Sequence, residues 1–190
     1  MDEKEKDLVE RVLNGDLSAF EPLIAPYRKP LLGLAYRITR NPEDAKEAAQ
    51  EAFLRAFKYL NRFDVEKSFK SWIFQILVHA ARNDQIKKRK RESLLMSEPL
   101  KTSALATGED PERGQADGEI RSRLMDCLDV LSPREREVFL LRDIEDMDIR
   151  ESARILKCSA ISVRVHLSAA RKKLRVRIKD RYPELLEGKR

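Results

Sequence analysis

Residues 159–174 have the sequence SAISVRVHLSAARKKL, and this stretch decides the fold of the C-terminal part of the chain. Its apolar side chains recur at the spacing of one buried helix stripe: Val163, Leu167, Ala170, Leu174 and Ile178. A turn at residues 157–160 precedes it, after a short helix predicted to open at Asp148. A short helix, a tight turn and a longer basic helix follow the order of a helix-turn-helix, which sets its second helix in the DNA major groove.

The composition of the whole chain indicates an all-α protein. Of 190 residues, 42% are hydrophobic and 38% are charged, with only 6 glycines and 8 prolines. Ala, Leu, Arg, Lys and Glu dominate, and these are strong helix formers. The net charge of +6 is unevenly spread, because residues 1–91 and 120–190 are basic whereas residues 92–119 are acidic. Basic helices of this kind are typical of proteins that bind polyanions, although they are compatible with other partners.

Helix start and stop signals divide the first 91 residues into four predicted helices. The first ends at Asn14-Gly15-Asp16, and the second, residues 18–40, is interrupted or loosened near Pro22, Pro26 and Pro30. Asn41-Pro42 supplies a capping side chain and a first-position proline that open the third helix, residues 42–60. The fourth helix is expected from about residue 68 into the basic run at residues 87–91.

Two small helical domains joined by a flexible linker are therefore predicted. The first domain comprises residues 1–91, and the second comprises residues 119–190. Residues 92–118 are acidic and contain Ser, Thr, Gly and Pro, as is typical of a linker. In the second domain, a helix is expected near residues 119–130, and Ser132-Pro133-Arg134-Glu135 has the pattern of a capping box that opens another helix.

The sequence offers no catalytic constellation, metal-ligand pattern or membrane segment. The two histidines fall in different predicted domains, and Cys127 and Cys158 lack metal-ligand or disulfide spacing and resemble buried thiols of a reducing compartment. Neither a signal peptide nor an apolar run long enough to span a bilayer is visible. We therefore expect a cytoplasmic protein that is not an enzyme, holds no metal or cofactor and makes no membrane contact of its own.

Five stretches occur in one order along the chain: DLVERVLNGDLSAFEPLIAPYRKPLLGLAYRI, EDAKEAAQEAFLRAF, FKSWIFQIL followed by KKRKR, LSPREREVFLLRDIE, and RILKCSAISVRVHLSAARKKL. Together they resemble bacterial RNA polymerase sigma factors of the extracytoplasmic-function class, group 4 of the sigma-70 superfamily. The resemblance implies a σ2-like domain that binds core RNA polymerase and melts the promoter −10 element. It also implies a σ4-like domain that binds the −35 element and the polymerase flap, and an anti-sigma factor that covers the polymerase-binding faces.

By this resemblance, an outward face of the third predicted helix binds polymerase. The residues concerned are Asp44, Glu47, Gln50 and Glu51. An acidic face steers docking onto basic residues of a partner. Lys46 stands where the family commonly has an acidic residue, which weakens the acidic patch. The alternative interpretation is the ordinary solvated face of an amphipathic helix.

The resemblance assigns recognition and melting of the −10 element to the fourth helix and the loop before it. The residues concerned are Arg62, Phe63, Asp64, Lys70, Trp72, Gln75, His79, Asn83, Lys87, Lys88 and Arg89. An exposed Trp72 ring stacks on an unpaired base, and capture of that base offsets part of the cost of unstacking DNA. The alternative is that Trp72 packs in the core. The basic run binds phosphates in this interpretation, and in the alternative it is a solvated helix end.

The resemblance assigns the −35 element to the helix quoted first. The residues concerned are Ser162, Arg164, Val165, His166, Ser168, Ala169, Arg171, Lys172 and Lys173. A rotation of about 100° per residue points Val165, Ser168, Ala169 and Lys172 outward. The family commonly has polar or basic residues at the first three of these positions, and often glycine where Lys157 and Ile161 stand.

Two consequences of this departure are expected. The basic residues Arg164, Arg171, Lys172 and Lys173 bind phosphates and orient the helix, while Val165 and Ala169 supply only apolar contacts, such as contact with a thymine methyl. Recognition then depends on the DNA backbone and on DNA shape, with fewer hydrogen bonds to bases.

Other functions remain as alternatives to a promoter-specificity subunit of RNA polymerase. A free-standing helix-turn-helix regulator uses the C-terminal domain in the same way, but it has no need for the acidic face at residues 44–51 or for Trp72 at the surface. In a second alternative, the basic residues of 159–174 merely keep a surface helix soluble. A nuclease requires clustered carboxylates or histidines, and the sequence has none.

Overall fold

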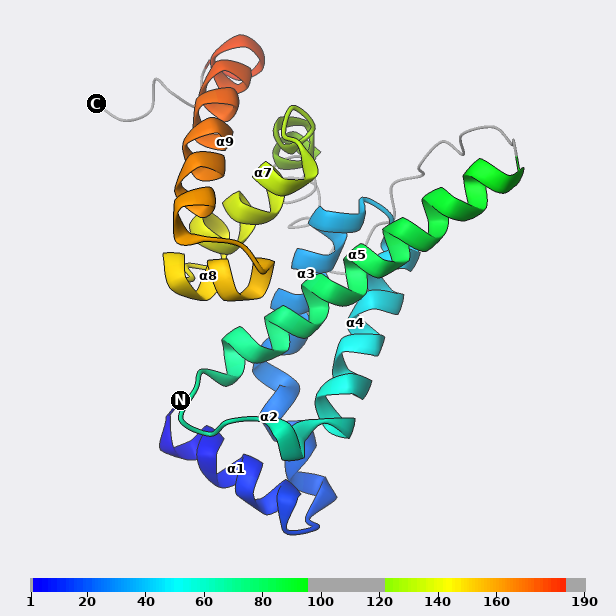
Figure 1. The fold of residues 1–190 in the computed structure, drawn as a ribbon, viewed down its shortest axis with the longest axis vertical. Helices are drawn as coiled ribbons and strands as arrows, with labels where there is room; N and C mark the ends of the chain where they lie inside the picture. Colours follow the sequence, from blue (N-terminus) through cyan, green and yellow to red (C-terminus); the bar gives the residue numbers. More distant parts are fainter. Residues whose placement is uncertain (1, 96–121, 184–190) are drawn as a thin grey trace, which may run out of the picture. The chain divides into compact units, whose positions relative to one another are not determined.

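The described parts of the chain form α-helices joined by short 3-10 and π-helical turns, with no strand among them (Figure 1). The computed structural model describes the backbone of residues 2–95 and 122–183 and the side chains of residues 2–83 and 122–183. These form two compact helical units, one containing α1 to α5 and the other containing α7, α9 and most of α8. The expected all-α fold with two helical domains is confirmed.

Three long helices form the body of the first unit. α3 (Arg28–Thr39), α4 (Pro42–Lys58) and α5 (Phe69–Leu95) pack on one another. α1 (Glu3–Leu13) and α2 (Phe20–Ile24) precede them. The predicted linker comprises residues 92–118. Only its first residues, up to the end of α5 at Leu95, belong to the described part of the chain.

The segment predicted as a helix interrupted or loosened by prolines, residues 18–40, is divided into shorter pieces. 3-10 turns at Leu17–Ala19 and Ala25–Tyr27 flank α2, and α3 begins only after the second of them. Each of the three prolines lies in the first turn of its piece: Pro22, Pro26 and Pro30. The first N–H groups of a helix have no partner within it, so a proline, which lacks an N–H, is tolerated there and not further along.

Small side chains allow α4 to lie close to its neighbours. Its buried residues are all alanines: Ala45, Ala48, Ala49, Ala52 and Ala56. Larger side chains from α3 and α5 complete the core, among them Leu31, Leu34, Phe69, Phe74 and Leu77. The distance between packed helices depends on the side chains at their contact, and a row of alanines shortens it.

The predicted start of α4 is confirmed by its capping contacts. The Asn41 side-chain oxygen accepts hydrogen bonds from the N–H groups of Glu43 and Asp44, at 2.9 and 3.0 Å. Both acidic residues also lie at the positive end of the helix dipole. These contacts fix the residue at which α4 begins.

The second unit contains helical residues 122–128, α7 (Pro133–Phe139), a π-helical turn (Leu140–Ile144), residues 149–153 of α8 (Ile149–Leu156) and α9 (Ala160–Arg181). The predicted capping box of α7 is confirmed, because the Glu135 N–H donates to the Ser132 hydroxyl and the Ser132 N–H donates to the Glu135 carboxylate. Asp148 and Glu151 exchange the same pair of bonds at the start of α8, at 2.8 and 3.1 Å. Both starts follow the sequence pattern because their partners are only three residues apart.

The predicted turn and the buried stripe that position α9 are also confirmed. Lys157 has a left-handed backbone conformation (φ 52°), which reverses the chain after α8. The Ser159 hydroxyl then caps α9 by accepting a hydrogen bond from the Ser162 N–H at 3.0 Å. Four residues of the predicted stripe are buried, Val163, Leu167, Ala170 and Leu174, and Ile178 is half-buried. α8, the turn and α9 therefore form the helix-turn-helix order expected from the sequence.

Candidate polymerase and DNA interfaces

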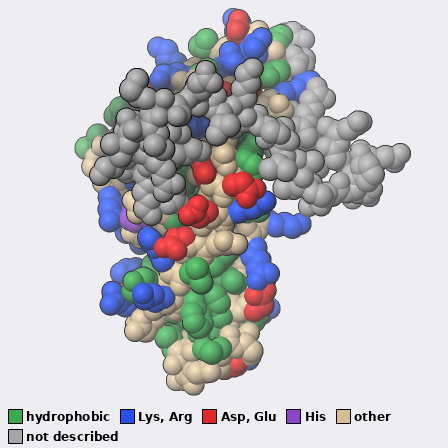
Figure 2. All heavy atoms as spheres, turned by 90° about the vertical axis from the view of Figure 1, so that its right-hand side faces the viewer, with side chains coloured by type: hydrophobic (Ala, Val, Ile, Leu, Met, Phe, Trp, Pro, Cys, Tyr) green, Lys and Arg blue, Asp and Glu red, His purple; other side chains and the backbone are tan. Residues whose placement is uncertain are grey.

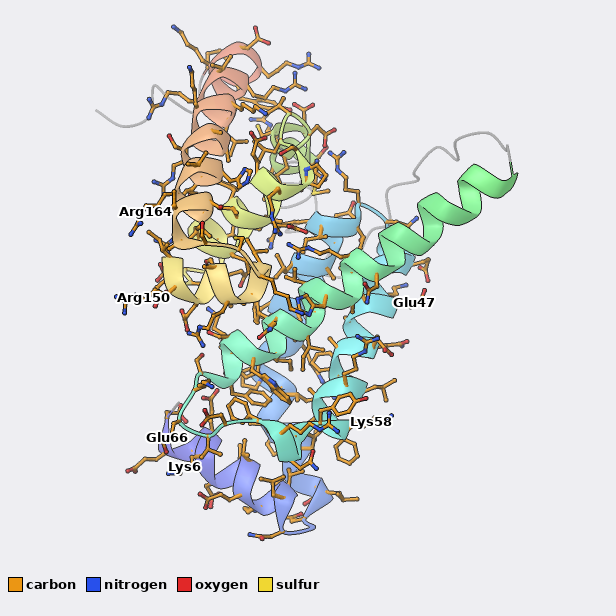
Figure 3. The ribbon with its side chains drawn as sticks, in the orientation of Figure 1. Lys6, Glu47, Lys58, Glu66, Arg150 and Arg164 are labelled. Carbon is orange, nitrogen blue, oxygen red and sulfur yellow. The ribbon has the colours of Figure 1, made fainter. Side chains whose placement is uncertain are left out.

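The outward face of α4 carries the four residues predicted to bind polymerase. Glu47 and Gln50 are exposed, and Figure 3 shows Glu47 pointing away from the neighbouring helices. Asp44 and Glu51 are half-buried at the edge of the same face, and Glu51 accepts a hydrogen bond from Arg55 one turn later, at 2.5 Å. The structure thus brings all four onto one helix, with Glu47 and Gln50 the most accessible.

The same helix exposes apolar side chains that the sequence analysis missed. Leu54 is 65% exposed and Phe57 is 43% exposed, and the ring of Phe57 meets that of Phe20 edge-on, with centroids 5.0 Å apart. Figure 2 shows hydrophobic side chains gathered in the lower part of that view, on the α4 side of the first unit. The helical rotation that points Glu47 outward also points Leu54 outward, since they are seven residues apart, and this spacing is the signal that was available.

Lys46, predicted to weaken the acidic face, forms an ion pair at the start of α4. Its ammonium group lies 2.9 Å from the Glu43 carboxylate, one turn earlier on α4. The lysine therefore neutralises its own neighbour at the start of the helix. The pair is exposed, and such surface pairs contribute about 0–1 kcal/mol to stability.

Four aromatic rings from three parts of the first unit meet at the start of α5. The Phe63 and Trp72 centroids lie 5.0 Å apart, Phe63 and Phe69 5.5 Å, and Tyr27 and Phe69 5.6 Å. Phe63 and Phe69 are buried, whereas Trp72 is half-buried. Trp72 therefore packs on neighbouring rings and is also partly exposed to solvent. Its position is compatible both with core packing and with stacking on a base.

The loop before α5 is ordered by its own polar contacts. The Asp64 carboxylate accepts hydrogen bonds from the Glu66 N–H at 3.1 Å and from the Lys67 ammonium group at 2.9 Å. The bond from Lys67, followed by that from the backbone, lowers the pKa of Asp64. The Arg62 guanidinium lies 5.0 Å from the centroid of the Tyr59 ring. Arg62 and Asp64 are both exposed, in contrast to Phe63 between them.

The remaining residues predicted to contact the −10 element lie before and after Trp72 along α5. Lys70, Gln75 and His79 are half-buried and Asn83 is exposed. The spacing of Trp72, Gln75, His79 and Asn83 places them along one side of the helix. Lys87, Lys88 and Arg89 lie within the helical span of α5, but their side chains fall outside the described residues.

The predicted −35 residues lie between positions 162 and 173 of α9. Arg164, Val165, Ser168, Arg171, Lys172 and Lys173 are exposed, while Ser162, His166 and Ala169 are half-buried. Two exposed apolar residues on this face, Ile161 and Val176, were not predicted as site residues, although the same 100° rotation places them outward. Arg150 of α8 is also exposed, and Figure 3 shows it and Arg164 extending outward on the same side of the second unit.

Acidic residues of the same unit hold two of the predicted phosphate-binding residues. Arg171 donates two hydrogen bonds to the Asp143 carboxylate, at 2.6 and 2.8 Å. Lys173 donates to the Glu135 carboxylate at 2.7 Å. Arg164 and Lys172 have no such partner within the described part of the chain. The basic residues of α9 therefore divide into two that are ion-paired and two that are available.

Glu135 links the start of α7 to α9. Burial alone would raise the pKa of its carboxyl group, but hydrogen bonds from Lys173 and from the N–H and hydroxyl of Ser132 outweigh it and lower the pKa. The carboxylate is thus charged in the folded unit, where it both caps α7 and fixes the rotation of α9.

The described residues contain neither a cluster that suits a metal ion nor a helix long and apolar enough to cross a bilayer. No group of three or more His, Cys, Asp or Glu side chains in them is placed to hold a metal. Each helix in residues 2–95 and 122–183 is likewise too short or too polar to cross a bilayer. Cys127 is buried and Cys158 half-buried, and both are free thiols.

Comparison with known proteins matches the two units to two parts of one protein family. The sigma-70 region 2 model matches residues 23–92, which include α4 and most of α5. The sigma-70 region 4 model matches residues 121–174, which include α8 and the first half of α9. The free-standing regulator considered above does not account for the first of these matches.

Full-length relatives extend the likeness beyond these regions. The chain is 30% identical to the RNA polymerase sigma-H factor of Pseudomonas aeruginosa over 175 residues, which cover 89% of this chain and 91% of that one. It is 28% identical to the ECF RNA polymerase sigma factor SigW of Bacillus subtilis, over 92% of this chain and 97% of that one.

Solved structures show the same fold. CnrH in complex with the cytosolic domain of CnrY superposes with a TM-score of 0.70 at 22% identity, over 94% of this chain and 99% of that one. RpoE of Bartonella quintana in complex with the anti-sigma factor NepR superposes with a TM-score of 0.67 at 21% identity, over 90% and 98%. From the region matches, the full-length relatives and the fold together, the chain belongs to the sigma-70 family as an RNA polymerase sigma factor of the extracytoplasmic-function class.

Proposed function

We propose that this sigma factor binds core RNA polymerase through the outward face of α4 and directs it to promoters through α5 and α9. The observation that carries the proposal is the α4 face itself, where exposed Glu47 and Gln50 continue into exposed Leu54 and Phe57. A surface with both a charged part and an apolar part is typical of protein interfaces, in which charge steers docking and apolar area supplies affinity.

The start of α5 supports a role in opening the −10 element. Trp72 rests on Phe63 and Phe69, so the ring is held in place while its free side remains available to a base. A fixed aromatic ring loses little side-chain entropy when a base stacks on it, and each such stack contributes about 1–3 kcal/mol. This energy offsets the unpairing of a base without hydrolysis of a nucleotide.

The helix-turn-helix supports contact with duplex DNA at the −35 element. Arg164 and Lys172 are exposed on α9 and Arg150 is exposed on α8, so cations from two helices are available to phosphates. Contacts from both helices to the backbone orient the second helix in the major groove.

In this proposal the chain supplies promoter selection and melting, while the polymerase supplies the chemistry. The place of action is then the bacterial cytoplasm, where transcription occurs. An anti-sigma factor that covers the α4 face is proposed as the regulator, with support from the two similar folds, which were solved with CnrY and with NepR.

A charge reversal on α4 tests the polymerase-binding face. Glu47→Lys is expected to weaken binding of the full-length chain to core polymerase by about tenfold or more, because like charges at an interface cost several kcal/mol. Glu10→Lys is the matched control, since it makes the same change at an exposed position on α1. Equal binding by Glu47→Lys and the native chain, or equal loss in both variants, would contradict the proposed face.

A further inference from the structure

The base-facing side of α9 is apolar where it should meet DNA. Ile161 is 69% exposed and Val165 is 61% exposed, one helical turn apart at the start of the helix. The nearby Ser162 hydroxyl is already engaged in a hydrogen bond with the Ser159 hydroxyl at the helix cap, at 2.9 Å. In a helix-turn-helix, the first turns of the second helix face the base edges. Two aliphatic side chains therefore occupy positions where hydrogen-bonding groups commonly contact bases.

Exposed cations accompany this apolar pair on α8 and α9. Arg164 lies beside Val165 in the sequence, Lys172 follows two turns later, and Arg150 extends from α8 on the same side as Arg164 (Figure 3). None of the three has an ion-pair partner within the described residues. A cationic rim matches a polyanion, and it opposes burial of the pair against an ordinary protein surface.

The DNA major groove presents one apolar group, the C5-methyl of thymine. We propose, on the basis of the function proposed above, that Ile161 and Val165 recognise thymine methyl groups in the −35 element, so that this sigma factor selects A·T pairs there by apolar contact. Arg164, Lys172 and Arg150 bind the flanking phosphates and set the depth of the helix. Specificity at these positions follows from removal of the methyl group and the aliphatic side chains from water.

Uracil in place of thymine tests this directly, because it removes only the methyl group and keeps the base-pairing edge. The probe is the −35 duplex of the strongest promoter found when start sites are mapped with core polymerase and the full-length chain. Each thymine of the probe is replaced by uracil, and binding of the reconstituted holoenzyme is measured. Loss of one buried methyl corresponds to about a fourfold loss of affinity.

Side-chain variants assign the effect to this pair. Val165→Ala is expected to reduce the thymine preference, and Ile161→Ala to reduce it at a neighbouring position. Val176→Ala is the matched control, because Val176 is a 64% exposed valine on the same side of α9 but about 16 Å further along the helix. It should leave the thymine preference unchanged. All three side chains are exposed, so the variants are expected to keep the native fold, which circular dichroism checks.

Several results would overturn the inference. One is equal binding of the thymine and uracil probes by the holoenzyme. Another is a thymine preference that is the same in Val165→Ala as in the native chain. A third is the absence of thymine from the −35 regions of the strongest promoters. Loss of polymerase assembly in Val165→Ala, with thymine preference retained, would assign the pair to a protein partner and overturn it as well. Failure of the holoenzyme to bind any start-site duplex would instead refute the proposed function, so the two failures are distinguishable.

Discussion

Neutralisation of Lys172 is predicted to weaken promoter binding equally for all DNA sequences. It should also reduce the salt dependence of binding by the amount that corresponds to one phosphate contact. Lys172 points outward from α9 and has no ion-pair partner among the described residues. A lysine that contacts a phosphate releases about 0.9 of a counterion, so Lys172→Met should reduce the slope of log K against log salt by about 0.9. At about 0.1 M salt this is about an eightfold loss of affinity, or about 1.2 kcal/mol.

Arg171 is the internal comparison, because the structure gives it a different environment. Its guanidinium is held by two hydrogen bonds to Asp143, a residue whose side chain is 21% exposed. For Arg171 to reach a phosphate, Asp143 must give up its partner and take up a cation, which cancels the counterion released from DNA. Arg171→Met should therefore change the slope by much less than Lys172→Met. Asp143→Ala releases Arg171 and should increase the slope by up to about 0.9.

The assay is titration of a labelled promoter duplex with reconstituted holoenzyme at a series of salt concentrations, for the native chain and the three variants. A second duplex with an altered −35 sequence separates phosphate contact from base contact. Equal slopes for Lys172→Met and Arg171→Met would refute the division of the α9 cations into paired and available groups. A loss in Lys172→Met confined to one sequence would refute phosphate contact by Lys172.

Three further predictions concern the framework that positions these surfaces. Lys157→Gly should stabilise the folded chain by about 1 kcal/mol, because Lys157 has φ 52° and glycine adopts this conformation without a steric penalty; the transition temperature of the full chain measures it. Ala52→Leu should destabilise the first unit by about 1–3 kcal/mol, because the fully buried Ala52 has no room for a larger side chain, whereas Leu54→Ala at an exposed position should have little effect; chemical denaturation compares the two. Glu135→Gln should reduce the acid sensitivity of the second unit. The pKa of Glu135 in the folded chain is below its ordinary value of 4.5, so its contribution to the free energy of unfolding is present above pH 4.5 and is lost as the pH falls through the lower folded value. Unfolding is followed from neutral pH to below 4.5. The loss of stability over this range should be smaller in the variant than in the native chain.

Local features of this fold were predictable from the sequence because their partners are close along the chain. Asn41 caps α4, Ser132 and Glu135 form a capping box, and the buried stripe of α9 lies where its spacing predicts. The family was also predictable, because its motifs occur in order over most of the chain. The segment at residues 18–40 was predicted less well, since proline signals show where a helix is interrupted but not how its pieces pack.

The partners of the site residues were not predictable. Arg171 and Asp143 are 28 residues apart in sequence, and Lys173 and Glu135 are 38 apart, so no local pattern indicates that they pair. From the sequence alone, the basic residues of α9 are therefore equivalent candidates for phosphate binding. The environment of Trp72 is likewise not predictable, because its contacts with Phe63 depend on the path of the preceding loop. Helix rotation predicts the exposure of Ile161 and Leu54, but exposure of a single aliphatic side chain does not by itself indicate a binding site.

Transcription with purified components tests the central claim most directly. Core RNA polymerase is incubated with genomic DNA fragments, with and without the full-length chain, and the 5′ ends of the transcripts are sequenced. The account predicts defined start sites that appear only when the chain is present and that share two upstream elements, one at −35 and one at −10. The same start sites with and without the chain, or none in either case, would contradict its assignment as a promoter-specificity subunit.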